Sequence, residues 1–207
     1  MARKVVVIGA SAGGVEAISY IASQLPLDFD AAVFVVLHVS PNATSMMPQI
    51  LSRSGVLPAV HAGASDPIRE GVIYIAPPDK HMLLRDGLVL ATDEPREHGH
   101  RPAVDPLFRS AAEEYGERAI GVILTGNLGD GAAGLAAIKA HGGIAMVQDP
   151  DEAAHPGMPS AAIQQVEVDA ILHLRLIVPA IIKAMSDIDR RARTRDTQHI
   201  SEEPGRS

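Results

Sequence analysis

The chain has 207 residues and a net charge of −7 at pH 7, contains no cysteine, and is 46% hydrophobic and 21% charged. This composition is typical of one globular domain. The lack of cysteine excludes disulfides, thiolate catalysis and cysteine-ligated zinc, and the acidic balance disfavours a nucleic acid partner. The N-terminal apolar run is too short for a secretory signal, and no stretch has membrane-spanning length. We therefore expect a cytoplasmic protein without membrane insertion.

Short apolar runs alternate with segments of helical periodicity along most of the chain. This alternation predicts an α/β fold: a doubly wound, mainly parallel sheet with helices on both faces. The expected strands are 4–8, 31–37, 119–124, 144–147 and 170–174, and the expected helices are 13–24, 44–54, 103–115, 131–140 and 176–186.

Residues 57–101 interrupt this rhythm. Three short strands are expected there, at 72–76, 82–85 and 88–92, and Asp86-Gly87 between the last two is a strong hairpin signal. We interpret the segment as a small antiparallel excursion within the same domain. From Arg190 onward the chain is rich in Arg, Glu and Ser without periodicity. The predicted organisation is therefore a catalytic domain over 1–189 and a disordered tail over 190–207.

Three chemically competent side chains follow three of the predicted parallel strands. Ser11 lies in Gly9-Ala-Ser-Ala-Gly13, a G-x-S-x-G turn of the nucleophile-elbow type, between the first strand and the first helix. His38 ends the second strand, and Asp130 follows the strand at 119–124. Because the carboxyl ends of parallel strands meet at one edge of a sheet, these residues predict a nucleophile, a base and an orienting carboxylate.

Each of the three residues also has a structural interpretation. The glycine-rich turn around Ser11 can serve only to pack the helix on the strand, His38 can be a strand-end histidine, and Asp130 can cap the following helix. A dinucleotide-binding enzyme is a rival from the fold alone. However, the first turn is not G-x-G-x-x-G, His38 stands where an acidic ribose ligand is wanted, and the chain has no G-K-[ST] of a P-loop.

At these residues the sequence resembles the catalytic domain of the chemotaxis-type protein-glutamate methylesterases. The resemblance runs in register from about Lys4 to Ala184. The segments that carry it are Ile8–Ile18, Val36–Pro41, Val72–Pro78, Arg101–Ala112, Leu124–Gly134, Gln148–Pro150 and Gly157–Ile163.

The resemblance implies that Ser11 is the nucleophile, His38 the base and Asp130 the orienting carboxylate. It implies hydrolysis of glutamate γ-methyl esters on the cytoplasmic domain of methylated receptors, with release of methanol, and some relatives also deamidate glutamine. No metal or organic cofactor is implied. The family's receiver domain has no room before Lys4, so we expect constitutive activity, control by a separate receiver protein, or another target. The alternative is a non-catalytic signalling module with the same fold.

Four further residues are candidates for holding the oxyanion or the substrate. Ala12 stands where many relatives carry a threonine, and Asn127 replaces a frequent methionine in a turn that the family uses near its oxyanion. Arg101 begins a family segment beside the expected cleft, and Met158 follows a loop that the resemblance places at the cleft rim. Asp105 and His155, close to Arg101 and Met158 in the sequence, are weaker candidates of the same kind.

A histidine-rich segment raises the possibility of a metal site. His98-Gly-His100, with His81 and the nearby Glu94 and Glu97, has no convincing third ligand at a fixed spacing. We therefore interpret these histidines as surface residues and predict no metal.

Overall fold

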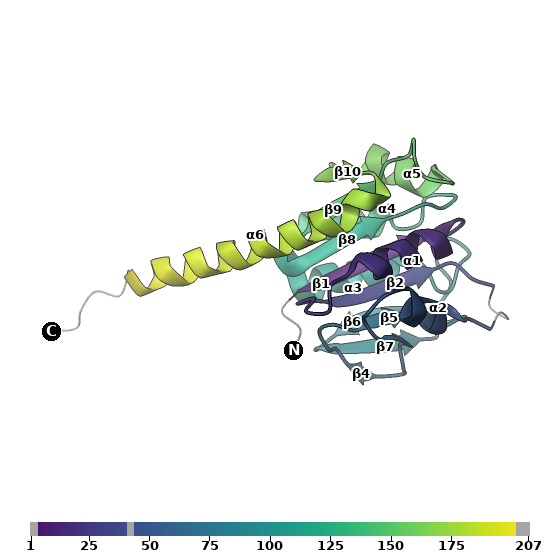
Figure 1. The fold of residues 1–207 in the computed structure, drawn as a ribbon, viewed down its shortest axis with the longest axis horizontal. Coiled ribbons are helices and arrows are strands. Elements are labelled where there is room, and N and C mark those ends of the chain that lie inside the picture. Colours follow the sequence, from purple (N-terminus) through teal and green to yellow (C-terminus); the bar gives the residue numbers. More distant parts are fainter. Residues whose placement is uncertain (1–3, 41–43, 202–207) are drawn as a thin grey trace.

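The computed structural model describes residues 4–40 and 44–201. Within these residues, seven parallel strands form one sheet in the order β10-β9-β8-β1-β2-β5-β3, and three antiparallel strands form a second sheet in the order β4-β7-β6 (Figure 1). The doubly wound α/β prediction is confirmed. The strands are β1 Val5–Ala10, β2 Ala32–Leu37, β3 Ala59–His61, β4 Asp66–Pro67, β5 Ile73–Ile75, β6 His81–Arg85, β7 Leu88–Thr92, β8 Ala119–Ile123, β9 Ile144–Gln148 and β10 Ala170–Leu172. The α-helices are α1 Gly14–Gln24, α2 Met47–Ser54, α3 Val104–Tyr115, α4 Ala132–Ala140, α5 Gly157–Gln165 and α6 Leu174–Ser201.

Both faces of the large sheet are covered, which explains why its central strands are continuously apolar. Along β1, Val6 and Ile8 pack into a core with α1, α2 and α6. Val5 and Val7 point to the opposite face and pack with α3, α4, α5 and the small sheet. The two cores therefore fix β1 in the middle of the molecule. None of the helices in the described part of the chain combines the length and apolar character that crossing a bilayer requires.

The segment 57–101 is less separate from the main sheet than the sequence predicted. The Asp86-Gly87 hairpin is confirmed, with both residues at positive φ, 52° and 74°. In contrast, β5 pairs in parallel with both β2 and β3 and extends the large sheet. The interpretation of the whole segment as antiparallel was therefore wrong for β3 and β5. The reason is that Ile73–Ile75 is buried on both faces, as a strand inside a parallel sheet must be.

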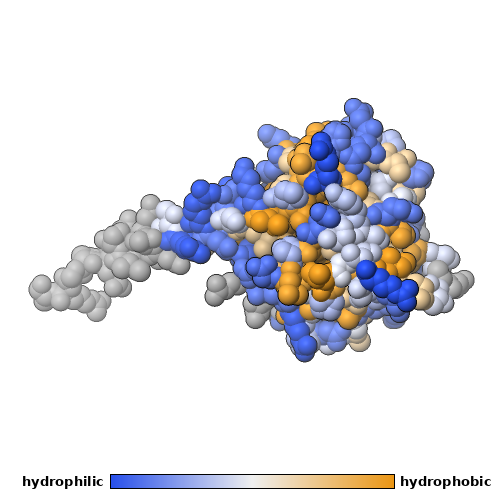
Figure 2. Space-filling view, in the orientation of Figure 1, coloured by the Kyte–Doolittle hydropathy of each residue, from blue (hydrophilic) through white to orange (hydrophobic). Residues whose placement is uncertain are grey.

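Residues 190–201, which the sequence predicted as part of the tail, are helical. Helix α6 continues to Ser201, and Figure 1 shows its last turns extending beyond the sheet. No glycine or proline follows Pro179 before Ser201, so nothing in the sequence ends the helix. Ion pairs from Arg190 to Asp187 and from Arg195 to Glu117 support the extension. The part of its surface that Figure 2 colours is hydrophilic. Residues 202–207 lie outside the described residues.

The order of the strands reverses beside β1. The chain passes from β1 to β2 on one side, and later enters β8 on the other side of β1. In doubly wound sheets, such a reversal opens a crevice at the carboxyl ends of the strands, where ligands bind. Ser11 follows β1 and His38 follows β2, so the fold brings both residues to this crevice.

Candidate active site

The register of the sheet places Ser11 beside His38. Ala10 of β1 pairs with Leu37 of β2, so Ser11 and His38 are the next residues along two neighbouring strands. The backbone N–H of His38 donates to Ala10 O (3.2 Å), and that of Ser11 donates to Thr125 O at the end of β8 (3.0 Å). Main-chain hydrogen bonds of the sheet therefore hold the serine and the histidine in adjacent positions.

Asp130 joins this pair through a short hydrogen bond. Its Oδ2 lies 2.7 Å from His38 Nε2, and the two side chains are only 1% and 8% exposed. The same carboxylate accepts the backbone N–H groups of Val104 (2.7 Å) and Asp105 (3.1 Å) in the first turn of α3. Burial raises the pKa of Asp130, but the hydrogen bonds from His38 and from these two amides outweigh it and bring that pKa below its usual value. Asp130 therefore stays ionised beside the imidazole.

The hydrogen bond to Asp130 decides which ring nitrogen of His38 is available. A neutral imidazole that donates from Nε2 carries its lone pair on Nδ1, so Nδ1 is the atom that can take a proton. Within residues 4–40 and 44–201, Ser11 Oγ makes no hydrogen bond. Nucleophile and base are often this loosely placed in unliganded sites and tighten when substrate binds.

Two backbone N–H groups beside Ser11 are free to receive a developing oxyanion. Across the described part of the chain, the amides of Ala12 and Asn127 donate to no protein oxygen, whereas the amide of Ser11 is used by Thr125. Ala12 follows the serine directly, which is the position that supplies one donor in a nucleophile elbow. Among the described residues, these two sequence candidates therefore offer main-chain N–H groups that no protein acceptor occupies.

The turn that carries Asn127 packs against the nucleophile. A Cβ on Gly126 would overlap Met158 Sδ and lie 2.9 Å from Ser11 Cβ, so only glycine fits between them. Met158 is buried, and its N–H donates to Gly126 O (2.8 Å). The candidate Met158 thus supports the turn beside Ser11. The exposed side chain of His155 does not contribute, but its carbonyl accepts the Gly126 N–H (2.9 Å).

Thr125 is a buried residue that the sequence reasoning did not single out. Its hydroxyl donates to Ala12 O (3.0 Å) and accepts the N–H of His155 (2.9 Å). It therefore ties the nucleophile turn to the loop that leads into α5. The only signal in the sequence was its place in a family segment, because a buried threonine is usually a packing residue.

Arg101 lies in a different setting from the one expected. Its guanidinium makes a two-pronged interaction with Asp79, at 3.2 and 3.0 Å, and also donates to the carbonyls of Asp93 and Glu94. These contacts use the fork of donors that would otherwise bind a carboxylate or carbonyl of a substrate. The arginine therefore fastens the loop after β5 to the chain after β7.

The interpretation of the histidines as surface residues was wrong for two of the three. His81 is fully buried at the start of β6, where Nε2 donates to Pro95 O (2.9 Å) and Nδ1 accepts the Ala103 N–H (3.2 Å). His100 is partly buried, and its ring stacks on the ring of His38. Only His98 has a largely exposed side chain. The sequence lacked a helix or strand periodicity around these histidines that could have indicated burial.

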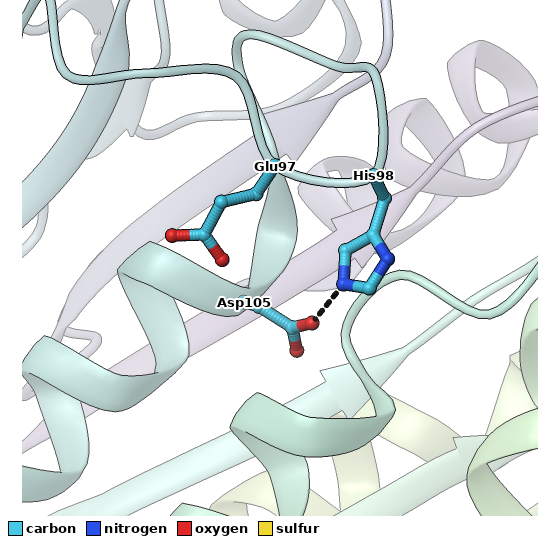
Figure 3. A group of neighbouring side chains, drawn as sticks. All are labelled: Glu97, His98 and Asp105. Atoms are coloured by element: carbon cyan, nitrogen blue, oxygen red, sulfur yellow. Dashed lines mark hydrogen bonds and ion pairs between the residues drawn. The ribbon is translucent and has the colours of Figure 1, made fainter.

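Glu97, His98 and Asp105 lie together beside the start of α3, and a hydrogen bond joins His98 to Asp105 (Figure 3). Each of the three groups has a protein partner. His98 Nε2 lies 2.9 Å from Asp105 Oδ2, and Glu97 Oε1 accepts from Arg109 (2.6 Å). Asp105 Oδ1 also accepts the N–H of Gly134 (2.6 Å), and burial raises the pKa of Asp105 above its usual value. We interpret the cluster as an ion-paired attachment of the 97–100 turn to α3.

A cavity of about 380 Å³ opens next to the Asp130 carboxylate. It reaches Asp130 and the two histidines of the 97–100 turn, and Leu128 forms part of its rim. Leu128 has a positive φ of 68° and its side chain is exposed. The candidate site is therefore open to solvent on the side of the Asn127 turn.

Comparisons with known proteins place the sequence in a family. The sequence profile described as CheB methylesterase matches residues 6–181. The chain is 41% identical over 169 residues to a protein-glutamate methylesterase/protein-glutamine glutaminase of Anaeromyxobacter dehalogenans, covering 82% of this chain and 50% of that protein. It is 37% identical over 191 residues to the corresponding protein of Pyrococcus horikoshii, covering 90% and 52%. The chain thus spans about half the length of these two relatives.

A solved structure shows the same fold. The crystal structure of the Thermotoga maritima CheB methylesterase catalytic domain superposes with a TM-score of 0.84 at 32% identity, covering 88% of this chain and 99% of that one. Fold and site together define an α/β domain with serine, histidine and aspartate at the carboxyl edge of its sheet. With a family profile that matches most of its length, the chain belongs to the CheB methylesterase family.

Proposed function

We propose that this chain is a serine esterase that hydrolyses glutamate γ-methyl esters on the cytoplasmic domain of methylated chemoreceptor proteins. The observation that carries the proposal is the arrangement of Ser11, His38 and Asp130 at three neighbouring strand ends. His38 Nε2 donates a hydrogen bond to Asp130 (2.7 Å), which leaves Nδ1 available to take the proton of the serine. Relatives named protein-glutamate methylesterase/protein-glutamine glutaminase support the substrate class.

The reaction proceeds in two stages. In the first, Ser11 Oγ attacks the γ-carbonyl carbon while its proton passes to His38 Nδ1. The oxyanion is held by the N–H groups of Ala12 and Asn127, and the C–O bond to the methoxy group breaks. The leaving group takes the proton from His38 and departs as methanol.

In the second stage, water resolves the glutamyl-serine ester. The water gives a proton to His38 Nδ1 as its oxygen attacks the carbonyl carbon. The bond from that carbon to Ser11 Oγ then breaks, and His38 returns the proton to Oγ. The products are a free glutamate carboxyl group and the original enzyme. Throughout, ionised Asp130 stabilises the imidazolium that forms at His38.

The same acyl-enzyme chemistry accommodates glutamine deamidation, in which ammonia leaves in place of methanol. The glutaminase part of the relatives' names supports this as a second activity of the same site. We also propose that the esterase acts in the cytoplasm and that a separate receiver protein controls it. The proposed reaction uses only protein groups and water, and no cofactor takes part in it.

Methanol release from a methylated receptor cytoplasmic fragment tests the proposal. The wild type should release methanol, and Ser11→Ala should reduce turnover by about 10⁴- to 10⁶-fold, as triad replacements do. The fold of the variant is checked by its circular dichroism spectrum. Equal turnover by the two proteins would exclude Ser11 as the nucleophile. An inactive wild type whose Ser11 still reacts with a serine-directed phosphonate would indicate another ester or amide as substrate.

A further inference from the structure

A tight turn from Glu97 to His100 lies beside the imidazole of His38. Glu97 and His100 exchange two backbone hydrogen bonds, of 3.1 and 2.8 Å. The two central residues both have positive φ, 50° for His98 and 79° for Gly99, as a type I′ turn requires. A positive φ is uncommon in residues other than glycine, and the contacts of His98 and Glu97 hold the turn in this conformation. Such local strain often marks a functional position.

The turn presents the ring of His100 to the ring of His38. The two ring centroids are 3.9 Å apart and the planes differ by only 4°. His100 therefore covers one face of the His38 ring. An imidazole makes its hydrogen bonds in the plane of the ring. A ring stacked on its face therefore does not disturb the hydrogen bond from Nε2 to Asp130, and it does not block Nδ1. His100 supports the ring without competing for either nitrogen.

The attachment of the turn connects His100 to the same helix that orients Asp130. His98 is bound to Asp105 of α3 at 2.9 Å (Figure 3). Glu97 is bound to Arg109, also on α3, at 2.6 Å. The first turn of α3 in turn donates its backbone N–H groups to Asp130. One helix therefore fixes both the carboxylate at the edge of the His38 ring and the second imidazole on its face.

We propose that His100 is a positioning residue for His38: it holds the ring in the orientation that directs Nε2 to Asp130, and its neutral ring stabilises the imidazolium formed when His38 takes the proton of Ser11. This inference rests on the proposed roles of Ser11, His38 and Asp130. A cation over the face of an aromatic ring is attracted to it, and more so where the ring also excludes water. The interaction becomes stronger as the proton is transferred.

The surrounding charges keep His100 neutral near pH 7. Burial lowers the pKa of His100 and the neighbouring His38 lowers it further, whereas Asp130 raises it. The charges of His98 and Arg96 also lower the pKa of His100, and Asp105 lines the same cavity. In acid, a proton on His100 would place a positive charge against the ring that must itself become positive. Protonation of His100 should therefore slow the reaction, and this effect adds to that of a proton on the base itself.

The rate at which a phosphonate probe modifies Ser11 tests the proposal without any receptor substrate. The rate is measured between about pH 4 and 8 for the wild type, His100→Ala, His100→Phe and the exposed control His141→Ala. At pH 7 we expect a loss of about tenfold or more for His100→Ala, since general-base catalysis supplies about 10²- to 10⁴-fold. His100→Phe should stay within about threefold of the wild type because phenylalanine restores the cover.

The shape of the acid limb separates this role from a purely structural one. In a plot of log rate against pH, the limiting slope should be about 2 for the wild type and about 1 for His100→Phe, because the second titrating ring is gone. Thermal melting shows whether each variant folds. If His100→Ala is unfolded, the comparison of the wild type with His100→Phe still tests the proposal. Identical pH profiles for the wild type and His100→Phe, or equal losses in the Ala and Phe variants, would overturn the proposal. A wild type that shows the expected profile but releases no methanol would overturn only the proposed substrate.

Discussion

Asp130 caps helix α3 while it orients His38. Its Oδ2 lies 2.7 Å from His38 Nε2 and also 2.7 Å from the backbone N of Val104, the first residue of α3. The sequence suggested a cap for the helix that follows Asp130, but α4 has no side-chain cap. The carboxylate instead closes a helix that starts 26 residues earlier in the chain. One side chain therefore serves the stability of the domain and the geometry of the site.

Replacing Asp130 with Asn should reduce both turnover and stability. An amide cannot stabilise an imidazolium, and its NH₂ group can favour the wrong tautomer of His38, so we expect a loss of about 10⁴-fold in turnover. Loss of the charged cap should lower the free energy of unfolding by about 1 kcal/mol. Phosphonate labelling of Ser11 and urea denaturation measure the two effects. An active Asp130→Asn variant would contradict the role assigned to the carboxylate.

The stability contributed by Asp130 should depend on pH. Its pKa in the folded state lies below the unfolded value of about 3.9, so the contribution is complete above that value and is lost as the pH falls through the folded pKa. The difference in unfolding free energy between the wild type and Asp130→Asn should thus be constant above about pH 5 and shrink below about pH 4. Urea denaturation at a series of pH values gives this difference. The exposed Asp28→Asn serves as the control and should show no such trend.

Thr125 gives a test of the contact between the nucleophile turn and the loop before α5. Thr125→Val keeps the shape but removes the hydroxyl that bonds Ala12 O and His155 N, which should cost about 1–3 kcal/mol of unfolding free energy. Ser11 labelling should also slow because the main chain of Ala12 is the proposed oxyanion donor. Thr125→Ser, which keeps the hydroxyl, should behave like the wild type. If serine is as damaging as valine, the methyl group and not the hydroxyl is what matters.

Gly126 should tolerate no side chain. Gly126→Ala places a methyl group against Met158 Sδ and 2.9 Å from Ser11 Cβ, so the serine or the Asn127 turn must move. Displacements of about 1 Å in an active site cost about 10²-fold in rate, and we expect a loss of that size in Ser11 labelling. Gly129→Ala, whose added methyl would make only an ordinary contact at 3.4 Å, is the matched control. Equal rates for the two variants would show that the turn is not in contact with the nucleophile.

Lys4 should be important for stability and not for catalysis. It is buried at the start of β1 and donates to Asp189 of α6 (2.7 Å) and to Asp30 (2.9 Å). Burial opposes its charge, but these carboxylates raise the pKa of Lys4 overall, so the contribution holds below its unfolded pKa and is lost only in strong alkali. Lys4→Met should lower the unfolding free energy by about 1–3 kcal/mol. The exposed Lys183→Met is the control, and Ser11 labelling of both variants should match the wild type.

The sequence predicted the parts of the fold that repeat. Strands such as β1 and β8 are apolar throughout because both faces of the sheet are covered, and the helices between them have clear periodicity. The edge of the sheet was harder, since β3 and β5 have only three residues each and their pairing depends on distant partners. Helix α6 was shortened in the prediction because a polar helix beyond the core has no apolar stripe to reveal it.

The main residues of the candidate site were also predictable, whereas their supports were not. Ser11, His38 and Asp130 each follow a strand, so topology alone brings them to one edge. The stacking of His100 on His38 depends on the backbone of a four-residue turn, and no periodicity encodes it. Arg101 was misjudged for a related reason. Its partner Asp79 is 22 residues away in the sequence, and nothing local indicates that the guanidinium is already engaged.

Helix α6 also determines how far anything attached to its end stands from the catalytic domain. The ion pair between Lys4 and Asp189 fixes the helix to the sheet, and the turns from Arg190 to Ser201 project beyond it (Figure 1). At 1.5 Å per residue these twelve residues measure about 18 Å. A dye, a surface tether or a fused domain joined after Ser201 is thus held about one helix extension away from the sheet, and the crevice at the opposite ends of the strands stays uncovered by it.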